Sequence, residues 1–279
     1  MDIINQVEQL LDQEIVDIFI GYREVDGHLL PHGFTKNRRH EIKALKTGDN
    51  RYSLEKMAAH LAKADDTLKI GIIARDCNKR AVNVLCAWNQ LNPEKIKTID
   101  VNCCPSPIKP HADCSLLEPK QSGAFKREHG IAFDDDPEQF MEKNDNKERF
   151  SRWMYEFDKC IKCYGCRNIC PVCFCNECSL ENPDLVETGK LPPDVPIFHL
   201  IRASHMAGRC IDCGLCEEAC PADIPLRLLY REMNRIVSRV FDYRPGESME
   251  KSPFTTIGQG VTLTPKPMAA TAGETSNEL

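Results

Sequence analysis

Two cysteine-rich segments of this sequence share one pattern and one ending. Residues 160–171 read CIKCYGCRNICP, and residues 210–221 read CIDCGLCEEACP. Each has the run C-x2-C-x2-C, a further cysteine after three more residues, and a proline directly behind it. This spacing is typical of the thiolates that hold [4Fe–4S] cubes. The repeat therefore predicts two [4Fe–4S] clusters that transfer single electrons, because a cube with four protein thiolates leaves no iron open to a substrate.

The last cysteine of each segment is expected to serve the cluster of the other segment, as in two-cluster ferredoxins. The first cluster then takes Cys160, Cys163, Cys166 and Cys220, and the second takes Cys210, Cys213, Cys216 and Cys170. Gly165 and Gly214 lie inside the loops, where the backbone passes close to inorganic sulfide and donates N–H bonds to it. Zinc sites also use C-x2-C pairs, but the third cysteine, the repeat and its proline favour iron–sulfur.

Three more cysteines follow the first segment at once: Cys173, Cys175 and Cys178. They are either ligands of a third cluster completed from elsewhere or a reduced loop that shelters the first cluster. The second alternative is favoured because no fourth ligand lies nearby in the sequence. His199 and His205 flank Arg202 between the segments and are expected to be core or solvated side chains rather than ligands.

A further group of cysteines lies in the amino-terminal half. Cys77 and Cys103 each follow a predicted parallel strand, where open α/β sheets place their ligands, and Cys104 and Cys114 are close in sequence. A metal site and incidental thiols are the two alternatives here. Incidental thiols are favoured, since a free cysteine behaves as a small hydrophobic residue.

Charge and hydropathy narrow the class of protein. The chain has 279 residues, 16 cysteines and a formal net charge of −6, which argues against a nucleic-acid partner. No stretch approaches the roughly 18 apolar residues of a membrane span. The first residues have neither the basic region nor the cleavage site of a secretory signal. We therefore expect a cytoplasmic protein whose clustered thiols are ligands rather than disulfides.

Local patterns predict a small amino-terminal α/β domain over residues 1–115. Asp26-Gly27 separates two β-prone runs, 16–25 and 29–35, and predicts a hairpin. A helix over 54–63 is expected to be capped by Ser53. A strand, a helix and a strand then follow with a right-handed crossover. Their expected bounds are 68–74, 78–88 and 97–101.

The remaining chain is expected to be mostly helical. Residues 116–150 are assigned to a linker that becomes helical toward 150–157, and residues 151–246 to a ferredoxin-like module with two [4Fe–4S] clusters. A helix over 223–243 closes this module. The Ser-, Thr- and Pro-rich tail, 247–279, is expected to be disordered. The fold class is thus α+β or α/β, followed by a helical iron–sulfur module.

The longest motif carries a family resemblance. CIKCYGCRNICPVCFCNECSLE, with GKLPPDVPIFHLIRASHMAGRCIDCGLCEEACPADIPL, resembles the carboxy-terminal module of the beta subunits of deazaflavin (coenzyme F420)-linked formate dehydrogenases and hydrogenases. The resemblance covers about residues 150–246. It is looser over 68–104, where Cys77 and Cys103 match cysteines of the family. It implies an FAD site in the amino-terminal domain and electron exchange with a larger partner.

The chain departs from that family in its amino-terminal domain. The family domain continues much further past the second parallel strand than residues 116–150 allow, and its Gly-rich amino-terminal stretch is not evident here. We therefore expect two [4Fe–4S] clusters without FAD. The chain would relay electrons between subunits of an anaerobic complex, with formate dehydrogenase, hydrogenase or a heterodisulfide-reductase-like flavoprotein as neighbours.

Two alternatives to this relay function stay open. One is an FAD-containing subunit that splits a hydride into single electrons. The other is a protein whose clusters sense oxygen or hold the fold together. No catalytic residue is predicted, because the sequence shows no nucleophile–base pair and no carboxylate pair for acid–base chemistry.

Overall fold

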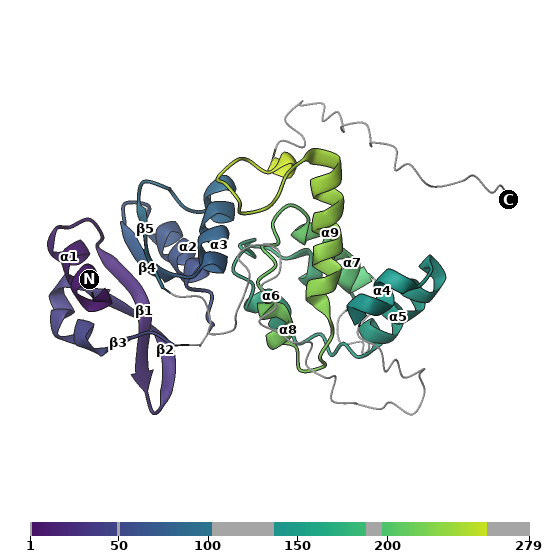
Figure 1. Ribbon diagram of the computed structural model, residues 1–279, viewed down its shortest axis with the longest axis horizontal. Helices are drawn as coiled ribbons and strands as arrows, with labels where there is room; N and C mark the ends of the chain where they lie inside the picture. Colours follow the sequence, from purple (N-terminus) through teal and green to yellow (C-terminus); the bar gives the residue numbers. More distant parts are fainter. Residues whose placement is uncertain (1, 49–50, 102–136, 188–196, 256–279) are drawn as a thin grey trace.

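The computed structural model describes residues 2–48, 51–101, 137–187 and 197–255. Residues 2–48 and 51–101 form a sheet with its helices, called here the α/β unit. Residues 137–187 and 197–255 form the cysteine-rich unit, which contains helices and loops. The two units lie side by side in Figure 1, with the sheet at one end and the long helix α9 in the other half. The predicted order of an α/β domain followed by a helical ferredoxin-like region is confirmed.

The predicted hairpin is confirmed. Strands β1 (Ile18–Val25) and β2 (His28–Thr35) pair in antiparallel fashion, and Val25 lies opposite His28. Asp26 and Gly27 both have positive φ, at 50° and 78°. A two-residue hairpin turn of type I′ requires positive φ at both of its central residues, because the turn then has the same twist as the flanking strands.

The predicted strand, helix and second strand are confirmed as well. Strands β4 (Ile70–Ala74) and β5 (Ile96–Asp100) are parallel, with helix α3 (Asp76–Ala87) between them in the chain. Every residue of β4 is buried, as its apolar sequence requires. The sheet order is β2-β1-β4-β5, and a short strand β3 (Leu45–Lys46) pairs with the edge of β1. Strand β1 therefore joins the hairpin to the parallel strands.

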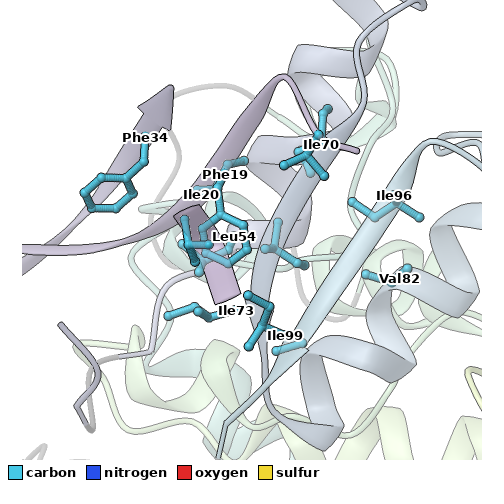
Figure 2. Packing of buried hydrophobic residues seen from close by; sticks show 14 of the residues in the cluster. Phe19, Ile20, Phe34, Leu54, Ile70, Ile73, Val82, Ile96 and Ile99 are labelled. Carbon is cyan, nitrogen blue, oxygen red and sulfur yellow. The ribbon is translucent and has the colours of Figure 1, made fainter. Parts of the chain in front are cut away.

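Helix α2 (Leu54–Ala64) covers the sheet together with α3. Figure 2 shows Leu54 and Val82 among sheet residues such as Phe19, Ile20 and Ile99. Ser53 stands at the start of α2 but makes no side-chain hydrogen bond to the helix, so the predicted cap is wrong. Its carbonyl instead accepts the N–H groups of the first turn.

Besides the short strand β3, two elements of the α/β unit were not predicted. Helix α1 (Ile3–Asp12) buries Val7 and Leu11, and a 3-10 segment η1 (Lys36–Ala44) follows the hairpin. Within the described ranges, no helix combines the length and the apolar character that a membrane crossing requires.

The cysteine-rich unit begins with two helices, α4 (Pro137–Lys143) and α5 (Asn146–Asp158). Helicity thus starts at Pro137, earlier than expected inside 116–150. Asp145 fixes the start of α5, because its side chain accepts the N–H groups of Lys147 and Glu148. The further elements are α6 (Gly165–Asn168), η2 (Ser179–Glu181), α7 (Ile197–Met206), α8 (Leu215–Glu218), α9 (Leu226–Phe241) and η3 (Pro253–Thr255).

The expectation of disorder from residue 247 is wrong for its first part. Residues 247–255 return along the cysteine-rich unit and end in η3. Phe254 meets the ring of Phe241 edge-on at 5.6 Å, and Ser252 is fully buried. An aromatic contact therefore anchors a segment whose composition alone suggests a tail. Residues 256–279 lie outside the described residues.

Helix α3 joins the two units. Its residues Ala81 and Val84 belong to the same apolar cluster as the cysteines of the cysteine-rich unit. Arg80 donates a hydrogen bond to the carbonyl of Ile211 at 3.2 Å. The guanidinium of Arg209 lies 3.8 Å from the ring centre of Trp88, just past the helix end. Helix α3 is thereby held beside the second cysteine segment.

Candidate metal centre

The two cysteine segments have the same backbone conformation. Lys162 and Tyr164 in the first segment, and Asp212 and Gly214 at the equivalent positions of the second, all have positive φ. Each loop then runs into a single helical turn, α6 or α8. The repeat in the sequence is therefore a repeat in structure.

Backbone N–H groups in these loops point at the thiols. The N–H of Lys162 donates to Cys160 Sγ at 3.4 Å, and the N–H of Asp212 donates to Cys210 Sγ at 3.4 Å. The Gly165 N–H reaches Cys163 Sγ at 3.5 Å. Hydrogen bonds of this kind favour thiolates and tune iron–sulfur centres.

The first thiol set is Cys160, Cys163, Cys166 and Cys220, and the structure brings its members together. Burial raises the pKa of the Cys166 thiol to about 11, against the opposing charge of Arg202. The neighbouring Cys160, Cys220 and Cys163 raise it further. Cys220 thus lies with the run of the other segment. A Cβ on Gly165 would come within 3.0 Å of the Ala219 carbonyl, which shows how closely the two segments approach.

The second thiol set is Cys170, Cys210, Cys213 and Cys216, and its members line one pocket. Burial is the largest cause that raises the pKa of Cys216 well above its ordinary value. The neighbouring thiols of Cys213, Cys210 and Cys170 raise this pKa further. The remaining walls of the pocket are largely apolar, with Ile211 and Leu215 among them. Cys170 and Cys220 are therefore exchanged between segments in space, an arrangement that favours the predicted ligand assignment.

The donor chemistry of both sets fits a [4Fe–4S] cluster. Each set offers four sulfur donors, amide N–H groups and an apolar surround, which are the features that hold and tune such clusters. Among the described residues, no group of three or more His, Cys, Asp or Glu side chains is arranged to hold a single metal ion. A cube spreads its four thiolates more widely than one ion does, because each thiolate binds a different iron.

The two sets differ in their surroundings. In the first set, Cys163 is exposed to solvent. The second set faces the α/β unit, where Arg51 contacts the Cys213 carbonyl and pairs with Glu218. Cys77, at the start of α3, is close enough that its charge contributes to the raised pKa of Cys213, after burial and Cys170. One set thus opens to the surface, and the other lies at the contact between units.

The thiols of Cys173, Cys175 and Cys178 have three different arginine partners. Arg202 donates to Cys173 Sγ at 3.4 Å, Arg209 donates to Cys175 Sγ at 3.7 Å, and Arg167 bonds to Cys178. This divergence favours the sheltering loop over a third ligand set. Cys77 is half-buried, and Cys103, Cys104 and Cys114 lie outside the described residues.

Two buried polar residues near the thiols were not predicted to matter. Arg202 on α7 is 3% exposed, and Tyr230 on α9 is 2% exposed. Both line the pocket of the second thiol set. The sequence held a signal for Arg202, because it falls on the helical stripe of Phe198 and Met206, which is otherwise apolar. His199, one turn earlier, is buried and stacks on Phe157 at 4.4 Å, as expected for a core histidine.

Known proteins resemble part of this chain. Residues 204–225 match the family model of the 4Fe–4S binding domain. The beta subunit of an F420-dependent formate dehydrogenase from Methanocaldococcus jannaschii is 46% identical over 106 residues, which is 38% of this chain and 28% of that protein. The beta subunit of F420-dependent formate dehydrogenase 1 from Methanococcus maripaludis is 46% identical over 101 residues, which is 36% of this chain and 26% of that protein.

The chain spans little more than a quarter of the length of these curated relatives. Within that range, the resemblance inferred from the cysteine motifs is confirmed. Over more than a third of its length, this chain is a homologue of F420-dependent formate dehydrogenase beta subunits, and it carries a 4Fe–4S binding domain.

Proposed function

We propose that this chain is an electron-transfer subunit that holds two [4Fe–4S] clusters in one interlocked module. Cys160, Cys163, Cys166 and Cys220 ligate the first cluster, and Cys170, Cys210, Cys213 and Cys216 ligate the second. The observation that carries the proposal is the meeting of two sets of four thiols, each completed by the last cysteine of the other segment. When bound, the clusters supply one-electron transfer.

The two ends of the module have different tasks in this proposal. Arg51 and Arg80 bind carbonyls of the second segment and hold that end against the α/β unit. At the other end, the exposed Cys163 leaves an edge of the first thiol set open to a partner. The largely apolar walls of the second pocket keep water away from the cluster proposed there.

The partners follow from the relatives. Those proteins are subunits of F420-dependent formate dehydrogenases, so we propose that this chain also works within a multi-subunit oxidoreductase of anaerobic metabolism. A formate dehydrogenase, a hydrogenase or a heterodisulfide-reductase-like flavoprotein would then be its neighbour. We place the complex in the cytoplasm, where thiolates stay reduced.

Anaerobic purification followed by metal analysis tests the proposal. Two cubes require about eight irons and about eight acid-labile sulfides per chain. We expect two EPR signals that appear on reduction and vanish reversibly on oxidation. An iron content near zero, or clusters that collapse on the first reduction, would overturn the proposal. Stoichiometric flavin in the same sample would instead support the alternative of a subunit that splits hydride.

A further inference from the structure

A buried arginine lies between the two thiol sets. Its Nη2 donates to the carbonyl of Cys166 at 3.1 Å, and its Nη1 donates to Cys173 Sγ at 3.4 Å. This is Arg202 on α7, whose guanidinium also lies 5.8 Å from the ring centre of Tyr230. The positive charge of Arg202 is thus buried among sulfur atoms.

Two donors at this point have no hydrogen-bond partner within the described residues. They are the Nε–H of Arg202 and the hydroxyl of Tyr230, and both atoms are fully buried. A buried donor left without an acceptor is costly, so an unsatisfied one indicates a group that belongs there. Both residues line the pocket of the second thiol set. The sulfurs of a cluster in this pocket are the acceptors that these donors lack.

We propose that Tyr230 and Arg202 are positioning residues that set the reduction potential of the second cluster. The Tyr230 hydroxyl and the Arg202 Nε–H donate hydrogen bonds to its sulfurs. Reduction adds one electron and makes the cluster more negative, so hydrogen-bond donors and a nearby cation stabilise the reduced form and raise its potential. The inference rests on the proposed function, since it requires a cluster in the second set.

The charge of Arg202 and the hydroxyl of Tyr230 should affect the reduction potentials of the two clusters differently. Arg202 also binds the backbone of Cys166, so its charge acts on the first cluster as well as on the second. The hydroxyl of Tyr230 acts through a short-range hydrogen bond and affects chiefly the second cluster. Removing the hydroxyl should therefore move one potential, and removing the cation should move both.

An EPR-monitored redox titration of the full chain measures the reduction potentials of both clusters. Tyr230→Phe deletes one oxygen and keeps the ring, and Cys213→Ala identifies the signal of the second cluster by its loss. We expect the second cluster of Tyr230→Phe to be about tenfold harder to reduce, or about 59 mV lower. Tyr243→Phe is the matched control, because Tyr243 is a buried tyrosine of the same unit outside the pocket, and it should leave both potentials unchanged.

Arg202 variants test the charge. Arg202→Met should make both clusters harder to reduce, and Arg202→Lys should restore much of the difference because it keeps the cation. Should Arg202→Met fail to assemble clusters, the Tyr230→Phe result decides alone. A Tyr230→Phe protein with both clusters and wild-type potentials overturns the inference.

The same measurements distinguish a failure of this inference from a failure of the proposed function. A wild-type chain without two reducible clusters defeats the proposed function, and the inference falls with it. A wild-type chain with two reducible clusters whose potentials are the same in Tyr230→Phe and Arg202→Met leaves the proposed function standing and defeats the inference alone.

Discussion

A buried carboxyl of the α/β unit makes the stability of this protein depend on pH. Glu55 on α2 is 1% exposed, and Asn78 donates a hydrogen bond to its Oε2 at 2.9 Å. Burial raises the pKa of this carboxyl from 4.5 to about 7, although Asn78, Arg51 and Arg75 oppose the rise. Burial wins because the carboxylate would lose its water on all sides.

The sign of the effect follows from proton binding. Between pH 4.5 and 7 the folded chain keeps the Glu55 proton while the unfolded chain has released it, so the free energy of unfolding falls as pH rises. At about 1.36 kcal/mol per pH unit, the loss across this range is about 3 kcal/mol. The stabilisation that comes from the retained Glu55 proton is fully present below pH 4.5 and is lost above pH 7.

Glu55→Gln removes the titration and keeps an oxygen for Asn78. We expect the variant to gain about 3 kcal/mol relative to the wild type between pH 4.5 and 7.5. Anaerobic urea unfolding at a series of pH values, followed by tryptophan fluorescence, measures the difference. Glu177→Gln, at an exposed side chain, is the control. Wild-type and Glu55→Gln profiles that run parallel over this range would show that Glu55 does not cause the pH dependence.

Three further predictions concern packing. Gly246→Ala should lower the free energy of unfolding by at least about 2 kcal/mol, because its φ is +84° and its Cβ would lie 2.7 Å from the Arg80 carbonyl. Gly27→Ala has a similar φ without a neighbour and should cost about 1 kcal/mol in the same urea assay; equal losses would contradict the clash. Arg209→Ala should cost about 0.5–2 kcal/mol and shift the emission of Trp88 to longer wavelength, and an unchanged spectrum would count against the stacking. Phe254→Ala should free residues 253–255, so limited proteolysis should cut there faster than in the wild type; equal rates would contradict the anchoring role of this ring.

Local signals were enough for part of the fold. The Asp26-Gly27 turn and the apolar run of β4 were recognised because each depends on neighbouring residues alone. The pairing of β1 with β4 was not predicted, because it joins segments far apart in the chain. Helix α1 was not predicted either, although its buried residues Val7 and Leu11 have helical spacing.

The candidate site, like the fold, could be predicted from the sequence only in part. Cysteine spacing is a local pattern and identified the eight candidate ligands, whereas the donors around them come from α7 and α9. Tyr230 falls on the apolar face of α9, so its sequence position indicates a core residue. That Tyr230 lines the pocket of the second thiol set depends on how the helices pack, and a single sequence does not contain that information.

The exchange of Cys170 and Cys220 is the central claim, and two double variants test it most directly. With the exchange, Cys160→Ala/Cys220→Ala damages one thiol set and leaves the second complete. Cys210→Ala/Cys220→Ala damages both. We expect about four irons and one reversible EPR signal for the first variant and no intact cluster for the second. The reverse result, with the cluster surviving only in Cys210→Ala/Cys220→Ala, would show that each segment completes its own cluster and that Cys170 and Cys220 are not exchanged.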